Sequence, residues 1–196
     1  IVGGCDSLVA VTLGTGIGGG IVLDGRLLRG ANGFAGEPGH MVIDPDGPPC
    51  PCGQRGCWET FASGNGLGRL ARQAAADGRA PSVLAAAGSV DEIRGEHVTD
   101  LLDRAAPDAV EVFREFAGYV ALGVANLILL LDPEVVVIGG GLSAHGGMLE
   151  RLVGDELESR FASAVRDRNV RIMVSPGGPE AGAIGAAILG AYRHGG

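Results

Sequence analysis

Three of the four cysteines stand within eight residues of one another, and this cluster constrains the fold more than any other feature of the sequence. Cys50, Cys52 and Cys57 follow His40, so three thiolates and one imidazole are available on one short segment. Such a set suits tetrahedral zinc, and four protein ligands leave no coordination position open for catalysis. We therefore predict a structural zinc-binding loop. The alternative is three thiols without a shared ligand, beside a histidine that serves the core.

The charge and apolar content of the chain exclude several classes of protein. Its 196 residues carry a formal net charge of −8, and an acidic surface disfavours non-specific binding to nucleic acid, which requires clustered basic residues. No uninterrupted apolar run reaches the roughly 18–20 residues of a membrane span, and no signal peptide is visible. The simplest compartment is the cytoplasm, where thiols stay reduced, and this favours a metal site over a disulfide.

The apolar periodicity predicts an α/β fold with a single domain, because early strands are followed by alternating strands and helices. The expected strands are residues 7–13, a hairpin at 21–30 that turns at Asp24-Gly25, 40–44, 134–141 and 170–175. The expected helices are 58–76 with Ser63 as a cap, a segment that starts at a capping Thr99, 107–131, 148–165 and 181–193. Residues 77–89 are expected to form a loop or a weak helix.

A first glycine-rich segment, GTGIGGG at residues 14–20, follows the first expected strand. Gly14, Gly16 and Gly19 match G-x-G-x-x-G, but a strand follows rather than the helix that a dinucleotide-binding turn requires. The segment therefore predicts a strand–loop–strand turn whose backbone N–H groups can approach a phosphate, with Thr15 adding a hydroxyl. The alternative is a glycine-rich hairpin that binds no ligand.

A second glycine-rich segment follows the strand expected at 134–141. Gly139, Gly141 and Ala144 fit a looser G-x-G-x-x-A pattern, here between a strand and a helix. The acidic residue that would bind a nicotinamide cofactor's ribose is not evident after the following strand. Two other readings stay open: a tight turn that needs small residues, and a turn over which the adenosine part of a nucleotide lies.

Two carboxylates flank the expected metal ligands. Glu37 precedes His40 and Glu59 follows Cys57, so a bound metal would hold the backbone of both. Rigid carboxylates can accept hydrogen bonds from a polyhydroxylated ligand, and His40 could donate from the ring nitrogen that does not bind metal. The alternative is that both glutamates are solvated or cap the following helix.

These motifs resemble those of the ROK family, which contains bacterial sugar kinases and related repressors. Glu37-Pro38-Gly39-His40 resembles its E-x-G-H motif, and residues 50–59, CPCGQRGCWE, resemble its C-x-C-G-x-x-G-C-x-E zinc signature. LGTGIGGG is similar to the family's second phosphate loop, and VVVIGGG to its adenosine-side turn. Within the family, the motifs are most similar to those of bacterial ATP-dependent glucokinases.

The resemblance implies a fold and a place in it. The family has the actin-like, sugar-kinase ATPase fold, with two ribonuclease-H-like lobes around a cleft. Residues 1–196 would form the single C-terminal, large lobe, with its zinc-binding loop, and the N-terminal lobe would be absent from this chain. That lobe carries a D-x-G-x-T loop and an Asn-Asp pair whose Asp is the catalytic base; neither precedes Ser7 here.

The resemblance also implies a role for each motif residue. The expected zinc ligands are His40, Cys50, Cys52 and Cys57, and the expected sugar contacts are Glu37, His40 and Glu59. The expected contacts of ATP, which binds with Mg²⁺, are Thr15, Gly16, Gly18, Gly19 and Gly20 at the phosphates and Gly139, Gly140 and Gly141 near the adenosine. A homodimer is expected.

The implied reaction is transfer of the ATP γ-phosphate to the 6-hydroxyl of glucose. Because the base belongs to the other lobe, the chain is expected to be inactive alone. Three alternatives stay open: the sugar-sensing lobe of a ROK repressor, an N-acylhexosamine kinase, and a standalone zinc-stabilised module that binds sugar or dimerises.

Overall fold

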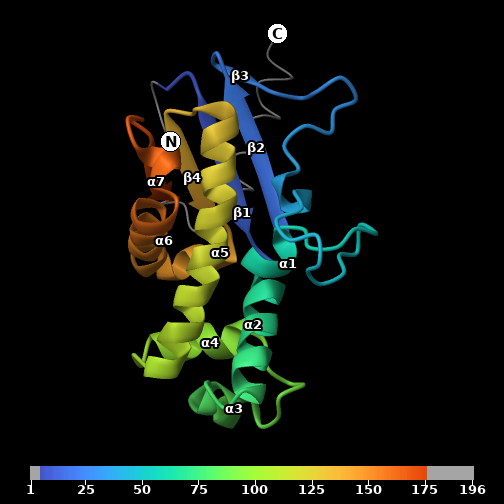
Figure 1. The fold of residues 1–196 in the computed structure, drawn as a ribbon, viewed down its shortest axis with the longest axis vertical. Helices are drawn as coiled ribbons and strands as arrows, with labels where there is room; N and C mark the ends of the chain where they lie inside the picture. The colour runs from blue at the N-terminus through green and yellow to red at the C-terminus, as the bar shows by residue number, and fades with distance from the viewer. Residues whose placement is uncertain (1–4, 176–196) are drawn as a thin grey trace, which may run out of the picture.

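The computed structural model describes residues 5–175, and the helix expected at residues 181–193 lies outside them. A sheet occupies one end of the molecule, shorter helices the other, and one long helix runs through both (Figure 1). The strands are β1 (Leu8–Leu13), β2 (Ile17–Leu23), β3 (Arg26–Leu27), β4 (Val135–Gly139) and β5 (Arg171–Val174). The helices are α1 (Glu59–Ala62), α2 (Gly64–Ala76), α3 (Pro81–Ala87), α4 (Gly95–Leu102), α5 (Pro107–Leu131), α6 (Gly146–Arg160) and α7 (Ala162–Val165), with 3-10 turns η1 (Pro38–His40) and η2 (Gly141–His145).

The sheet is mixed and has the order β3-β2-β1-β4-β5. β1 pairs antiparallel with β2 and parallel with β4, and β4 pairs parallel with β5. The β2–β3 hairpin turns at Asp24 and Gly25, whose φ angles of 50° and 68° are both positive, as a type I′ turn requires. The predicted α/β class and hairpin are confirmed.

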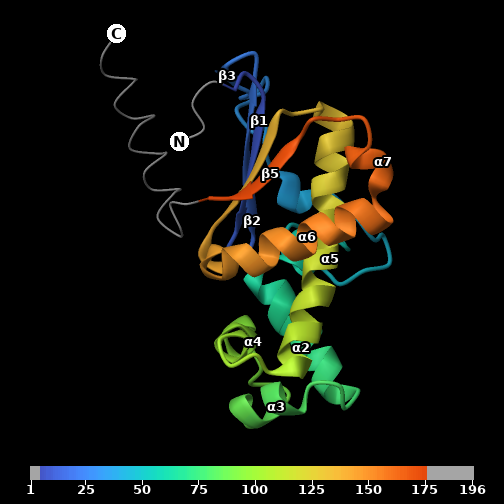
Figure 2. The ribbon, with the colours of Figure 1, turned by 90° about the vertical axis from the view of Figure 1, so that its left-hand side faces the viewer.

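The core lies between the sheet and the helices on one of its faces. Figure 2 shows α5, α6 and α7 on the same side of the sheet. Alternate residues of β1, namely Val9, Val11 and Leu13, are buried in a core cluster that also includes side chains of α5 and α6. This period of two follows from strand geometry, which sends successive side chains to opposite faces.

Helix α5 is the longest element and carries much of the core. Pro107 begins it, at a position where the missing N–H of proline breaks no hydrogen bond, and Asp132 ends it with a φ of 43°. Among the described residues, α5 is one helix that is long and apolar enough to cross a membrane, judged by length and composition alone. Polar and charged residues interrupt its apolar sequence, so the absence of an uninterrupted apolar run did not exclude it. Within its most apolar window, 56% is buried inside the fold, as in a core helix.

The segment before the cysteines differs from its prediction. Residues 40–44 form no strand; η1 ends at His40, and the nearby pairing is an isolated bridge between Val42 and Cys57. The reason is that the backbone N–H groups of Ile43 and Asp44 both donate to the carbonyl of Gly56, inside the cysteine loop. The segment therefore belongs to that loop rather than to the sheet.

The helices at the other end of the molecule, and α6 and α7, differ in part from their predicted bounds. Within the segment expected to form a loop or a weak helix, residues 81–87 form a helix, α3, which Pro81 begins. The helix expected to start at Thr99 begins four residues earlier, at Gly95, and the Thr99 hydroxyl donates to the carbonyl of Glu96 inside it. The helix expected at 148–165 begins at Gly146 and breaks at Phe161 into α6 and α7. Ser63 caps α2 as predicted, because its hydroxyl accepts from the N–H of Gly66 at 3.1 Å.

A buried tryptophan fixes the cysteine loop to α5. Trp58 is 0% exposed, and its Nε1–H donates to the carbonyl of Tyr119 at 2.7 Å. Its ring lies against Gly123 so closely that a Cβ on Gly123 would overlap the ring atoms. Because Trp58 directly follows Cys57, this contact sets where the loop meets the core.

We predict that Gly123→Ala lowers the free energy of unfolding by about 2 kcal/mol, since overpacking a filled core typically costs about 1–3 kcal/mol. Urea unfolding measures the effect. Gly154→Ala is the matched control, because Gly154 is also helical and has no atom within 4 Å of an added Cβ. Gly154→Ala is expected to raise the free energy of unfolding by roughly 0.5–1 kcal/mol, because alanine favours the helix more than glycine does. Equal stability of the two variants would contradict the packing described for Trp58.

Candidate functional site

The structure brings His40, Cys50, Cys52 and Cys57 together. Their potential ligand atoms all lie within 4.8 Å of one another. The Sγ atoms of Cys52 and Cys57 are 3.6 Å apart, and Sγ of Cys50 is 3.8 Å from Nδ1 of His40. Four ligands at about 2.3 Å around a tetrahedral zinc would be about 3.8 Å apart. The donor set and its spacing therefore fit a four-coordinate metal.

The thiols of this cluster differ in acidity. Burial raises the pKa of the Cys50 thiol to about 12, and burial also raises the pKa of Cys57. A hydrogen bond from the backbone N–H of Gln54 lowers the pKa of Cys52, which is exposed. Metals bind cysteine as thiolate, so a metal entering this site would displace protons from the two buried thiols. Affinity at the site would therefore rise with pH.

Glu59 joins the cluster to the turn between β1 and β2. Its Oε1 accepts from the Cys50 thiol at 3.1 Å and lies 3.7 Å from Nδ1 of His40. Its Oε2 accepts from the backbone N–H of Ile17 at 3.4 Å, and a Cβ on Gly16 would lie 2.6 Å from that oxygen. Two of the three predicted sugar-binding residues, His40 and Glu59, are thus neighbours. Glu37 is exposed at the start of η1, three residues before His40.

The first glycine-rich segment forms a shorter loop than predicted. Only residues 14–16 turn, with the N–H of Gly14 donating to the carbonyl of Gly16 at 3.0 Å. Gly18, Gly19 and Gly20 belong to β2 and pair with β1. Packing requires glycine at position 19, because an added Cβ would lie 2.6 Å from the ring of Pro38. This close approach places η1 against the strand that follows the turn.

The second glycine-rich segment closes over the end of β1. Gly139 is the last residue of β4, and Gly140 has a φ of 95°. A Cβ on Gly140 would overlap the carbonyl oxygen of Leu13, so no larger residue fits there. The chain then enters η2 at Gly141. The ends of β1 and β4 are therefore held in direct backbone contact, and the two glycine-rich segments are neighbours.

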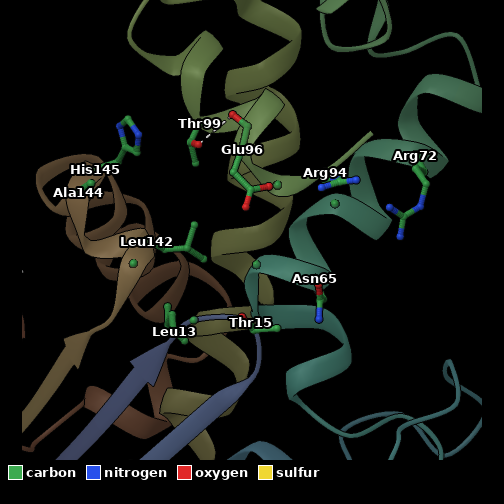
Figure 3. A pocket seen from close by; sticks show the side chains of 15 residues that line it. Leu13, Thr15, Asn65, Arg72, Arg94, Glu96, Thr99, Leu142, Ala144 and His145 are labelled. Atoms are coloured by element: carbon green, nitrogen blue, oxygen red, sulfur yellow. Dashed lines mark hydrogen bonds between the residues drawn. The ribbon is translucent and has the colours of Figure 1, made fainter. Parts of the chain in front are cut away.

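A cavity of about 720 Å³ opens beside these two segments (Figure 3). Its walls come from the end of β1 and the turn after it, from α2 as far as Arg72, from the start of α4 with the preceding Arg94, and from η2. The lining residues are Leu13, Gly14, Thr15, Gly64, Asn65, Gly68, Arg72, Arg94, Gly95, Glu96, Thr99, Gly141, Leu142, Ala144 and His145. Mixed charged, hydroxyl and apolar walls suit a ligand with a phosphate end and an apolar end.

The cavity and the cysteine–histidine cluster lie on either side of one turn. Thr15 lines the cavity, and the next residue, Gly16, lies against the Glu59 carboxylate on the cluster's side. A model of the ROK family matches residues 2–192 of this sequence. The chain belongs to the ROK family. The resemblance inferred from the E-x-G-H and cysteine motifs is thereby confirmed.

Named relatives of this ROK chain include glucokinases. The glucokinase of Streptomyces coelicolor is 39% identical over 190 residues, which cover 93% of this chain and 59% of that protein. A solved ROK family glucokinase from Streptomyces griseus, in complex with glucose and AMPPNP, is 38% identical with a TM-score of 0.86, covering 95% of this chain and 61% of that one. The chain thus spans about three fifths of the length of these relatives.

Other members of the ROK family match under different names. An N-acetylmannosamine kinase of Citrobacter koseri is 35% identical over 182 residues, covering 93% of this chain and 56% of that protein. A solved ROK family transcriptional regulator is 32% identical with a TM-score of 0.65, covering 86% of this chain and 41% of that one. Kinases and a regulator therefore share the fold described here.

Few of the residues predicted to bind ATP line the cavity itself. Thr15 and Gly141 do, whereas Gly16, Gly18, Gly19, Gly20, Gly139 and Gly140 lie behind them in the turns and strands. The charged and amide side chains of the lining, Asn65, Arg72, Arg94 and Glu96, were not predicted from the sequence. The one available signal was the spacing of residues 65, 68 and 72, which places them on one face of a helix.

We predict that Gly140→Ala lowers the free energy of unfolding by about 2–3 kcal/mol. At a φ of 95°, a residue other than glycine is strained by about 1–3 kcal/mol. The added Cβ would also overlap the backbone of Leu13. Gly141→Ala is the control, since the neighbouring residue has open space around its Cβ position. Urea unfolding should show a change below about 1 kcal/mol for that variant. Similar losses in both variants would refute the close contact of Gly140 with β1.

Proposed function

We propose that this chain is the C-terminal, ribonuclease-H-like lobe of a ROK sugar kinase that transfers the γ-phosphate of ATP to the 6-hydroxyl of glucose. One observation carries the proposal. The turn at Gly14–Gly16 has the Glu59 carboxylate and the cysteine–histidine cluster on one side and the cavity on the other. A sugar held by the cluster and a nucleotide held in the cavity would meet at that turn, as phosphoryl transfer requires.

The sugar would bind through Glu37, His40 and Glu59. Carboxylate oxygens accept hydrogen bonds from sugar hydroxyls, and the Glu59 carboxylate is held by Cys50 and by the backbone of Ile17. His40 would use Nδ1, which faces the cluster, toward the metal and donate from its other ring nitrogen to the sugar. The glucose complex of the Streptomyces griseus relative supports a sugar of this class.

Zinc would serve a structural role at His40, Cys50, Cys52 and Cys57. Bound there, it would supply four strong bonds that hold the loop and, through Cys57, the neighbouring Trp58 and Glu59 in place. Because all four positions are taken by protein atoms, sugar hydroxyls would contact the ligand His40 and the carboxylates rather than the metal. The metal would thus orient the sugar site without acting on the sugar.

The nucleotide would bind as its Mg²⁺ complex, with its phosphates at Thr15 and Gly16. Backbone N–H groups of the turn and the Thr15 hydroxyl would donate to phosphate oxygens, while Gly18, Gly19 and Gly20 keep the following strand close. Gly139, Gly140 and Gly141 would lie near the adenosine, where small residues leave room for the ligand. The AMPPNP of the Streptomyces griseus relative supports a nucleotide of this kind.

The catalytic base and the rest of the cleft would come from an N-terminal lobe outside these 196 residues. General-base catalysis contributes about 10²–10⁴ in rate, so this chain alone is not expected to phosphorylate glucose. A cytoplasmic homodimer is the proposed state of the whole protein. The similarity to an N-acetylmannosamine kinase makes an N-acylhexosamine the second candidate substrate, and the similar regulator makes a sugar-sensing lobe the second candidate role.

The metal site is tested by elemental analysis of the purified chain. We expect one zinc per chain, its loss in Cys57→Ser, and cooperative unfolding at lower temperature once a strong chelator removes it. Cys5→Ser is the control, because Cys5 lies outside the cluster, and this variant should keep its zinc. A chain that is folded, metal-free and equally stable in chelator would contradict the proposed zinc site.

The sugar site is tested by titrating the zinc-loaded chain with glucose in a calorimeter. We expect Glu59→Gln to bind glucose at least ten-fold more weakly, since a hydrogen bond to a charged group contributes about 1.5–3 kcal/mol. Glu92→Gln removes the same charge from an exposed position away from the cluster and should bind as the parent chain does. Zinc content is measured in each variant to show that the loop is intact. Unchanged affinity in Glu59→Gln would refute the proposed sugar contact.

A further inference from the structure

The cavity changes character from one end to the other. The end formed by Gly14 and Thr15 lies at the start of α2, a helix of 13 residues whose dipole is positive there. At the other end, among the described residues that line the cavity, Glu96 is the one carboxylate. The start of α2 therefore offers a positive dipole to a phosphate, and Glu96 offers a carboxylate in the same cavity, which Arg72 and Arg94 also line.

The Glu96 carboxylate is available to a ligand. Its side chain extends from α4 into the cavity (Figure 3). Within residues 5–175, its side-chain oxygens have no hydrogen-bond or ion-pair partner, and only its backbone carbonyl is used, by the Thr99 hydroxyl. Nearby, Arg72 is already engaged, since its Nη1 donates to the carbonyl of Ile93 at 2.7 Å. The carboxylate is thus an exposed acceptor with free capacity on the wall of the cavity.

Backbone contacts fix the position of Glu96 relative to the phosphate end. The N–H of Gly64 donates to the carbonyl of Gly14 at 2.7 Å, which ties α2 to the turn. A Cβ on Gly95 would lie 2.7 Å from the carbonyl oxygen of Gly64, and one on Gly68 would lie 3.1 Å from the N of Gly95. The start of α4 therefore packs against α2 through backbone atoms. This contact fixes the distance between Glu96 and the turn at Gly14 and Thr15.

A free carboxylate restricts what can lie beside it. A phosphate placed directly against the Glu96 carboxylate would be repelled by it, whereas Arg72 and Arg94 attract phosphate elsewhere along the lining. Neutral hydroxyl groups can instead donate to both carboxylate oxygens, in the way that acidic residues bind the ribose of dinucleotides in other folds. On the η2 wall, Leu142 and Ala144 give an apolar surface suited to a flat base. A helix start for phosphate, an acceptor for hydroxyl groups and an apolar wall are together what a nucleoside triphosphate requires.

We propose that Glu96 is the residue that recognises the ribose of the phosphoryl donor, by accepting hydrogen bonds from its 2′- and 3′-hydroxyl groups. Through this contact the site selects a ribonucleoside triphosphate over an inorganic polyphosphate chain. The inference rests on the proposed function in one respect, namely that the donor occupies this cavity. It adds the residue that distinguishes one class of donor from another.

Equilibrium dialysis of the chain with magnesium tests the inference, using ATP, 2′,3′-dideoxy-ATP and tripolyphosphate as probes. The parent chain should bind ATP at least five-fold more tightly than the dideoxy nucleotide, which lacks both hydroxyl groups. Glu96→Gln should bind these two nucleotides nearly equally and should bind tripolyphosphate as well as, or better than, the parent. Asp100→Asn removes the same charge from an exposed position on α4 that does not line the cavity, and should behave as the parent.

Three outcomes would overturn the inference, and the third would also overturn the proposed nucleotide site. If Glu96→Gln keeps the parent's preference for ATP over dideoxy-ATP, Glu96 does not recognise the ribose, while the proposed kinase function stands. If Glu96→Gln weakens tripolyphosphate as much as ATP, the carboxylate only supports the cavity wall. If the parent chain binds none of the three probes, the proposed nucleotide site itself is wrong.

Discussion

Three consecutive side chains, those of Cys57, Trp58 and Glu59, connect the three parts of the structure on which the site depends. Cys57 points into the cluster of potential metal ligands, Trp58 packs on α5, and Glu59 reaches the turn between β1 and β2. Because successive residues cannot move independently, a shift in any one of these contacts is passed to the other two. The end of the loop at Cys57 and Trp58 is thus anchored in the core, while residues 51–55 are exposed.

Close backbone contacts define the cavity in the same way. Gly14 meets Gly64, Gly64 meets Gly95, and Gly140 meets Leu13, in each case with main-chain atoms on both sides. Such contacts leave little freedom for adjustment, since a packed interior transmits strain instead of absorbing it. The walls are therefore set before a ligand arrives, and specificity is left to the few side chains that project from them.

Sequence patterns predicted the sheet strands apart from the first four residues of β2, and they predicted α5 and the cysteine–histidine cluster, because each depends on local periodicity or on residues close together in the chain. The error at residues 40–44 arose because the apolar residues there serve the cysteine loop, whose pairing with Gly56 no local pattern reveals. The cavity lining escaped prediction for a related reason. Arg72 and Glu96 are 24 positions apart and share a wall only because two glycines let α2 and α4 approach closely.

The length of α5 restricts where this chain can tolerate an insertion or a deletion. At 1.5 Å per residue its 25 residues extend about 37 Å; it contacts Trp58 near its middle, at Tyr119 and Gly123, and it also packs against α2, α3 and α4. Inserting or deleting one residue between these contacts would rotate one end relative to the other by about 100°. A change of chain length within α5 would therefore be costly, whereas an exposed connection such as residues 28–36 can accommodate one.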